Sequence, residues 1–311
     1  MSIVKINNLY KKFGDNIAVD SINITINQGE VYGLLGPNGA GKSTIINIMS
    51  GLLKMNKGSI EILQKDLGKN SKFIKRNIGV VPQELAIYEE LTAYENVKFF
   101  ASLYGLKGSE LKNKTFEALE FVGLKEKAKE YPKSFSGGMK RRLNIACAIA
   151  HTPKLIIMDE PTVGIDPQSR NHILKSVKKL NEKGSTIIYT THYMEEVETI
   201  CTRIGIIDHG KLIAEGTKEE LKAIVTDKKN IKLVVDQIDN INIKELQNIT
   251  GVLSVEFNED IVNINSNKET NNLDKIILYF TNNKISIRNI TSTEPNLETV
   301  FLTLTGRKLR D

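Results

Sequence analysis

The fold is decided by the stretch Gly36-Pro37-Asn38-Gly39-Ala40-Gly41-Lys42-Ser43-Thr44, which matches the phosphate-loop pattern G-x-x-x-x-G-K-[ST]. It lies between an apolar run, residues 31–35, and a helix-like run, residues 45–49, the strand–loop–helix setting that the pattern requires. Glycines let the backbone wrap closely around an anion, and the following helix adds its positive end. Lys42 can reach the β- and γ-phosphates, and the Ser43 hydroxyl can ligate Mg²⁺.

Composition indicates an ordinary globular protein. The length of 311 residues favours two domains. Of these residues 40% are hydrophobic and 26% are charged, which is typical of a globular protein. Its 43 basic and 37 acidic residues give a formal charge of +6, and it has no Trp, so a base-stacking nucleic-acid platform is not expected. The two cysteines, Cys147 and Cys201, fit a reduced compartment and inert packing. No secretory signal and no membrane span is expected, so any path across a bilayer belongs to another polypeptide.

Hydrophobic periodicity predicts an α/β core in the first part of the chain. Alternating segments near residues 3–9 and 18–26 indicate antiparallel strands. Apolar runs that alternate with helical patterns indicate a parallel sheet. They are predicted as strands at 31–35, 58–63, 78–81, 155–158, 186–190, 204–208 and 211–215 and as helices over 92–124, 139–150 and 167–182.

Composition changes near residues 226–229, where we expect a linker between a domain at 1–226 and a second at 230–311. The second part is Asn-rich and lacks the phosphate-site motifs. Its predicted order is strand, helix, strand, strand, helix, strand and a last helix, at residues 231–235, 243–249, 252–257, 261–264, 273–280, 285–290 and 297–304. This β-α-β-β-α-β order predicts a small α+β, ferredoxin-like domain.

Hydrolysis of a bound phosphate compound needs an acid that holds the metal and a group that orders the attacking water, in addition to the phosphate loop. Residues at the ends of the apolar strands supply these groups. Asp159 and Glu160 follow the strand at 155–158; the first suits Mg²⁺, and the second suits a base that polarises water. Gln83 and His192 end two other strands. A second anion-binding design, Ser136-Gly137-Gly138, precedes a helix. It requires a phosphate that the first loop does not already hold.

In this order and spacing, the motifs over about residues 2–221 resemble the nucleotide-binding subunit of an ATP-binding cassette (ABC) transporter. The implied fold is a P-loop NTPase ABC domain with a mixed-sheet core, an antiparallel β subdomain and a helical subdomain at about 84–150. By this resemblance, Gly36–Thr44 is the Walker A loop, Gln83 belongs to the Q-loop, and Ser136, Gly137 and Gly138 form the signature. Asp159 is the Walker B acid, Glu160 the catalytic base and His192 the switch histidine, and Val163–Asp166, including Asp166, is the D-loop. Phe13 is the residue that stacks on adenine, with Tyr10 as a rival for that role.

Two features refine the resemblance. The family's usual signature is Leu-Ser-Gly-Gly-Gln, whereas Phe135 and Met139 flank the glycines here, and a methionine cannot make the hydrogen bonds of an amide. The run Met139-Lys140-Arg141-Arg142, the tail over 294–307 and the small second domain are similar to ATPase subunits that pair with separate type-2 drug- and antibiotic-export permeases.

The resemblance implies ATP and Mg²⁺, a head-to-tail homodimer with two sandwiched nucleotides, and a separate permease. That permease would receive the motion through segments near residues 84–96. The expected location is the cytoplasmic face of the membrane. Lys42, Gln83, Glu160 and His192 are the expected catalytic group, and Ser43, Gln83 and Asp159 the expected metal ligands. Importers and lipid or polysaccharide exporters, soluble ABC ATPases and regulatory nucleotide-binding modules remain alternatives.

Overall fold

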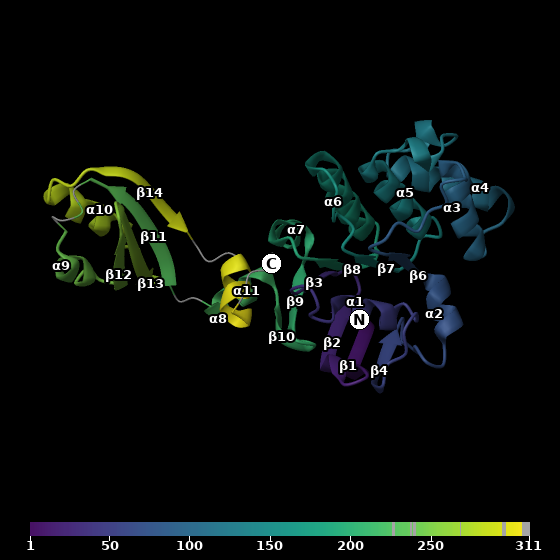
Figure 1. Cartoon of the computed structure of the whole chain (residues 1–311), viewed down its shortest axis with the longest axis horizontal. Helices are drawn as coiled ribbons and strands as arrows, with labels where there is room; N and C mark the ends of the chain where they lie inside the picture. The colour runs from purple at the N-terminus through teal and green to yellow at the C-terminus, as the bar shows by residue number, and fades with distance from the viewer. Residues whose placement is uncertain (226–227, 237, 239–240, 268, 294–296, 307–311) are drawn as a thin grey trace. The chain divides into compact units, whose positions relative to one another are not determined.

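The computed structural model describes residues 1–225, 228–236, 238, 241–267, 269–293 and 297–306 (Figure 1). Backbone contacts divide the chain into two compact units, Met1–Lys218 and a second that starts at Glu219. Residues 226 and 227 of the expected linker lie outside the described residues, and the expected boundary stays a prediction.

An antiparallel sheet opens the first unit. Its strands, in the spatial order β2-β1-β4-β5, are β2 (Asn16–Asn27), β1 (Ser2–Phe13), β4 (Lys57–Ile62) and β5 (Lys65–Asp66). Alternate residues of β1 and β2, such as Val4, Ile6 and Ile24, are buried, as the period-two pattern predicts.

A six-stranded mixed sheet forms the centre of this unit. Its strands, in spatial order, are β10 (Lys211–Gly216), β9 (Arg203–Asp208), β3 (Val31–Leu35), β8 (Thr186–Thr191), β7 (Leu155–Asp159) and β6 (Ile78–Val81). The strands from β9 to β6 run parallel, and β10 pairs antiparallel with β9. The carboxyl ends of β3, β8, β7 and β6 therefore meet at one edge of the sheet.

One hydrophobic core joins the two sheets through α1 (Lys42–Met49). Ile45 and Ile48 of α1 belong to the same buried cluster as Ile6 of the antiparallel sheet and Ile157 of the central sheet. The helix that follows the phosphate loop is thus fixed between two layers, and its N-terminus is held in place with it.

Eight further helices, two of them short 3-10 helices, surround this core in the described part of the first unit. They are α2 (Ser71–Asn77), α3 (Ala93–Leu103), α4 (Gly108–Phe121), the short η1 (Lys125–Lys127) and η2 (Pro132–Ser134), α5 (Gly137–Ile149), α6 (Pro167–Glu182) and α7 (Met194–Ile200). The helices α3, α4 and α5 pack on one another and form the helical subdomain (Figure 1). Among the helices in the described part of the chain, none has the length and apolar character needed to cross a bilayer.

Local signals explain why two predicted helical stretches begin or end at other residues than expected. The helical stretch expected over 92–124 is two helices, because Gly105 adopts a φ of +99° that breaks the chain between them. The helix expected from Met139 begins two residues earlier, because Ser136 is its N-cap and both glycines lie in its first turn.

The second unit contains a four-stranded antiparallel sheet in the order β12-β13-β11-β14. Its elements are α8 (Lys218–Val225), β11 (Lys228–Val235), α9 (Ile243–Gln247), β12 (Val252–Asn258), β13 (Ile261–Asn267), α10 (Leu273–Asn282), β14 (Ile287–Thr293) and α11 (Leu297–Thr305). From β11 to β14 this is the β-α-β-β-α-β arrangement of a ferredoxin-like domain. Ile231, Ile264 and Phe280 lie in its core. Residues 294–296 and 307 of the tail lie outside the described residues.

Ile157 in β7 tests the central core. Ile157→Ala removes a side chain that is 0% exposed, and we expect a loss of about 2–5 kcal/mol in unfolding free energy because a cavity remains. Leu52→Ala, at a side chain 73% exposed, should change it by about 0.5 kcal/mol or less. Chemical denaturation followed by far-UV circular dichroism measures both. Equal effects of the two substitutions would contradict the packing described here.

Candidate nucleotide-binding site

The loop between β3 and α1 is shaped by glycines that no other residue can replace without strain. A Cβ at Gly36 would collide with the carbonyl oxygen of Ile207, and one at Gly41 with that of Ala18. Gly39 and Gly41 also adopt φ values of +78° and +105°. The backbone can therefore curve around an anion at the N-terminus of α1, where the helix dipole is positive.

Lys42, the first residue of α1, lies inside this loop and is only 5% exposed. Its Nζ donates to the carbonyl oxygens of Gly36, at 2.8 Å, and Pro37, at 3.1 Å. It also lies 3.6 Å from Oε1 of Glu160. Burial lowers the pKa of this ammonium, and the nearby carboxylates of Glu160 and Asp159 oppose that effect. The Lys42 ammonium thus contacts carbonyl and carboxylate oxygens, and the oxygens of a phosphate group can take their place as its partners.

Three groups converge on the buried carboxylate of Glu160. Besides Lys42, the amide Nε2 of Gln83 donates to Oε2 at 3.3 Å, and Nδ1 of His192 lies 3.5 Å from the same oxygen. Gln83 follows β6, Glu160 follows β7 and His192 follows β8, which are neighbours in the sheet. The structure therefore brings together all four residues that the sequence suggested as catalytic.

Glu160 has a φ of +45°, which is uncommon for a residue other than glycine. Its backbone N–H donates to both the hydroxyl, at 2.8 Å, and the carbonyl oxygen, at 3.2 Å, of Thr190. The same hydroxyl donates to Oδ1 of Asp159 at 2.6 Å. Thr190 thus fixes both acidic residues in place. The sequence did not suggest Thr190, since the only feature that marks it there is its polar side chain at the end of an apolar strand.

A pocket of about 560 Å³ opens over the phosphate loop. It is lined by Phe13, residues 38–44, Gln83 and Glu160, together with Asn16, Ile17, Ala18 and His209, which the sequence did not suggest. The Phe13 side chain is 48% exposed, and Nζ of Lys11 lies 4.9 Å from its ring centroid. An exposed aromatic face at the mouth of a phosphate pocket can stack on a nucleotide base.

The second anion-binding motif lies at a different pocket. Ser136 caps α5 by accepting a hydrogen bond from Met139 N at 3.3 Å, and Asp166 caps α6 by accepting one from Ser169 N at 2.9 Å. The pocket is lined by Ser136, Met139, Arg142, Asp166, Gln168, Ser169 and His172. In the described part of the chain it shares no lining residue with the pocket over the phosphate loop. Gly138 lies against Ser169, with no room for a Cβ, and Gly137 opens the helix.

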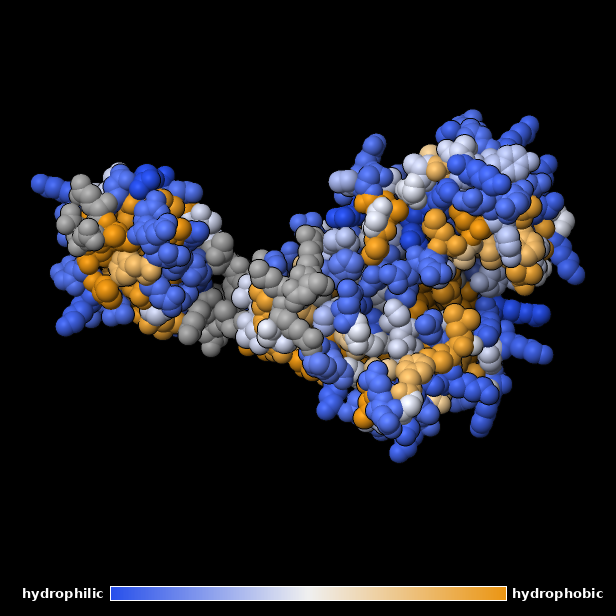
Figure 2. Space-filling view, viewed as in Figure 1, coloured by the Kyte–Doolittle hydropathy of each residue, from blue (hydrophilic) through white to orange (hydrophobic). Residues whose placement is uncertain are grey.

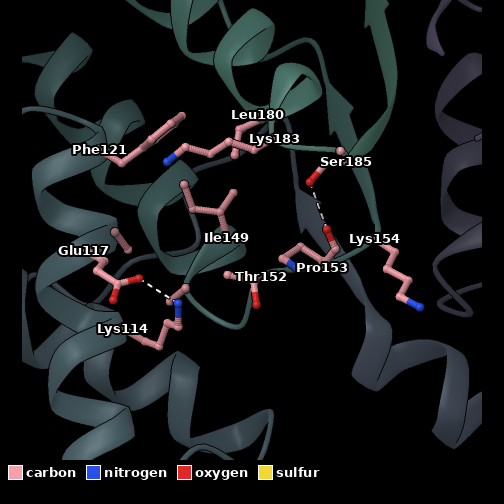
Figure 3. Close-up of a pocket in the computed structure, with 13 residues that line it drawn as sticks. Lys114, Glu117, Phe121, Ile149, Thr152, Pro153, Lys154, Leu180, Lys183 and Ser185 are labelled. Carbon is pink, nitrogen blue, oxygen red and sulfur yellow. Dashed lines mark hydrogen bonds and ion pairs between the residues drawn. The ribbon is translucent and has the colours of Figure 1, made fainter. Parts of the chain in front are cut away.

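A third pocket, of about 210 Å³, lies between α4, the end of α5 and α6 (Figure 3). Phe121, Ile149 and Leu180 line it, and Ser185 Oγ donates to the Pro153 carbonyl oxygen at 3.0 Å at its edge. None of the site residues suggested by the sequence is among those that line it.

Comparisons with known proteins show which family the chain resembles. Residues 19–163 match the family model described as ABC transporter. The linearmycin resistance ATP-binding protein LnrL of Bacillus subtilis (strain 168) is 47% identical over 307 residues, 98% of each chain. The Nod factor export ATP-binding protein I of Sinorhizobium fredii is 37% identical over 311 residues, 99% of this chain and 87% of that protein. A dimeric ATP-binding cassette solved in a post-hydrolysis state with ADP and Pi is 31% identical, with a TM-score of 0.63, over 69% of this chain and 98% of that one.

The fold and the loop define a P-loop enzyme that binds and hydrolyses ATP. The chain belongs to the ABC transporter family, in which it is one of the ATP-binding subunits. This confirms the family resemblance and the ABC fold expected from the sequence.

Lys42→Ala tests the phosphate loop. Removing the ammonium should lower both ATP affinity and phosphate release by at least about tenfold, because charge-assisted hydrogen bonds to phosphate are lost. Lys72→Ala, at an exposed lysine on α2, is the matched control and should behave as the parent chain. Binding is measured with a fluorescent ATP analogue and turnover by phosphate release. Near-normal turnover in Lys42→Ala would refute the role of this lysine.

Proposed function

We propose that the chain is the ATPase subunit of an exporter that drives drugs, antibiotics or other amphipathic molecules through a separate membrane permease. Support comes from the end-to-end similarity to a linearmycin resistance and a Nod factor export ATP-binding protein. Hydrolysis rests on one observation, the convergence of Lys42, Gln83 and His192 on the carboxylate of Glu160.

In the proposed mechanism, Glu160 accepts a proton from the water that attacks the γ-phosphorus in line. The bond from the γ-phosphorus to the β–γ bridging oxygen breaks, and ADP and phosphate leave. Lys42 holds the β- and γ-phosphates, while Gln83 and His192 orient the attacking water and stabilise charge on the γ-phosphate. These assignments use three nitrogen atoms that lie within 3.6 Å of the Glu160 carboxylate oxygens: Nζ of Lys42, Nε2 of Gln83 and Nδ1 of His192.

Mg²⁺ fits the oxygen donors near Lys42, two of which, Ser43 and Gln83, line the pocket over the phosphate loop. The hydroxyl of Ser43, the carboxylate of Asp159 and the amide oxygen of Gln83 are the hard oxygen ligands that this ion prefers. The Thr190 hydroxyl donates to only one oxygen of Asp159, Oδ1, and Oδ2 is the proposed ligand. Bound there, the ion would neutralise charge on the β- and γ-phosphate oxygens.

The two separate pockets support a head-to-tail dimer. One ATP cannot use both the phosphate loop and the serine–diglycine turn of the same chain, since they line different pockets. We therefore assign the second pocket, with Ser136, Gly137, Gly138 and Asp166, to the nucleotide held by a second copy. Phe13 is assigned to the adenine of the chain's own ATP. A solved relative is described as a dimeric cassette.

The proposed permease surface lies where α3 meets the segment after Gln83. Leu85, Tyr88, Phe99 and Leu103 are large apolar side chains that are 40–62% exposed, and the rings of Tyr88 and Phe99 are in edge contact at 5.4 Å. Figure 2 shows hydrophobic surface in the region of the helical subdomain. An apolar patch of this kind suits a protein partner, and a permease partner would place the chain at the cytoplasmic face of the membrane.

Glu160→Gln separates binding from hydrolysis. The amide keeps the size of the side chain but cannot accept the proton, so turnover should fall at least about a hundredfold while ATP still binds. Because the γ-phosphate then persists, the chain should elute as a dimer with ATP and as a monomer without it. Size-exclusion chromatography with light scattering measures this. A monomer at saturating ATP would count against the sandwich.

The double substitution Phe99→Glu/Leu103→Glu tests the permease surface. Two charges in an apolar interface should reduce the fraction of chain that sediments with washed membranes of the cells that produce it, without changing ATP turnover. Phe73→Glu, at a phenylalanine 46% exposed on α2, is the control. Unchanged membrane association of the double variant would contradict this surface.

A further inference from the structure

Three basic residues, Lys140, Arg141 and Arg142, follow the serine–diglycine turn, and each reaches a different partner. Nζ of Lys140 lies 2.5 Å from Oε1 of Glu89. Nη1 of Arg142 donates to the carbonyl oxygen of Val122 at 2.9 Å. Arg141 lies between them and contacts the segment that carries Gln83.

Arg141 bridges two successive backbone carbonyls at the end of β6. Its Nη1 donates to the carbonyl oxygen of Pro82 at 2.8 Å, and its Nη2 donates to that of Gln83 at 2.6 Å. The two nitrogens of one planar guanidinium therefore fix the direction of the chain at Gln83. A lysine ammonium has no such fork and can reproduce only part of this arrangement.

The guanidinium is buried, and carbonyl groups are its only hydrogen-bond acceptors among the described residues. Arg141 is 5% exposed, and its Nε has no hydrogen-bond partner in the described part of the chain. Burial lowers the pKa of this group. A buried charge held by neutral groups is costly for stability, and such a cost is expected where the charge has a functional role.

These contacts connect the two halves of the proposed composite site. The helix α5 is capped by Ser136 and includes Arg141. Arg141 holds the backbone of Gln83, and Nε2 of Gln83 donates to Oε2 of Glu160. A shift of α5 would therefore be passed to the carboxylate of Glu160 through the Arg141 side chain and the backbone at Gln83.

We propose that Arg141 is a positioning residue for ATP hydrolysis: it fixes Gln83 against Glu160 and makes the placement of Gln83 depend on the position of α5. This inference rests on the proposed roles of Gln83 and Glu160. It assigns a purpose to the second residue of the Lys140-Arg141-Arg142 run.

Arg141→Lys and Arg141→Met in the full chain test this inference by steady-state phosphate release with Mg²⁺ and ATP. Because the phosphate loop is untouched, the KM for ATP should stay within about twofold, while kcat falls at least about tenfold, with the lysine variant less impaired than the methionine variant. Lys140→Gln is the control on the same helix; its ion pair with the 45%-exposed Glu89 side chain contributes little, and kcat should stay within about twofold. Thermal unfolding and ATP binding establish that each variant is folded.

A double-mutant cycle with Gln83→Ala separates positioning from general support of the fold. If Arg141 acts through Gln83, Arg141→Lys should cause no further loss of kcat once the Gln83 amide is gone. An equal loss in both backgrounds, or a normal kcat in folded Arg141→Met, overturns the inference and leaves the proposed function intact. A Gln83→Ala variant with normal kcat overturns the role of Gln83 and this inference together.

Discussion

The carboxylate of Glu160 is the group on which the arrangement of the proposed catalytic site depends. Four neighbouring parallel strands, β3, β8, β7 and β6, end at one edge of the sheet, and each is followed by one of the residues that meet there. A buried carboxylate is costly unless charged and hydrogen-bonding groups surround it, so the positions of Lys42, Gln83 and His192 are mutually dependent. The sheet topology, more than any single contact, therefore produces the site.

The phosphate loop adds a second constraint, the lack of space beside its backbone. Gly36 packs against the carbonyl of Ile207 in β9, and Gly41 against that of Ala18 in β2, so strands from both sheets set the curve of the loop. Lys42 is held by two carbonyl oxygens and Glu160, and in the proposed mechanism it exchanges these partners for phosphate oxygens without leaving the site. The serine–diglycine turn lines a different pocket, and this separation is the physical basis of the proposed dimer.

Sequence reasoning could predict the parts of this arrangement that are local. The phosphate loop, the strand ends at Asp159 and Glu160, and the β-α-β-β-α-β order of the second unit are each written in short stretches with clear periodicity. Thr190 and Arg141 could not be found in this way, because their partners lie 31 and 59 residues away in sequence. The helices α2 and α7 were also not predicted, since seven residues are too few for a periodic pattern. Long-range contacts and short helices are therefore where the structure adds most.

The central claim is that each nucleotide is enclosed by two copies of the chain. The most direct test is a high-resolution structure of the Glu160→Gln variant loaded with Mg²⁺ and ATP. The account predicts two nucleotides per dimer, each on the phosphate loop of one copy, with the Ser136 hydroxyl of the other copy at hydrogen-bond distance from a γ-phosphate oxygen. A structure in which Ser136 of neither copy approaches a γ-phosphate would contradict it.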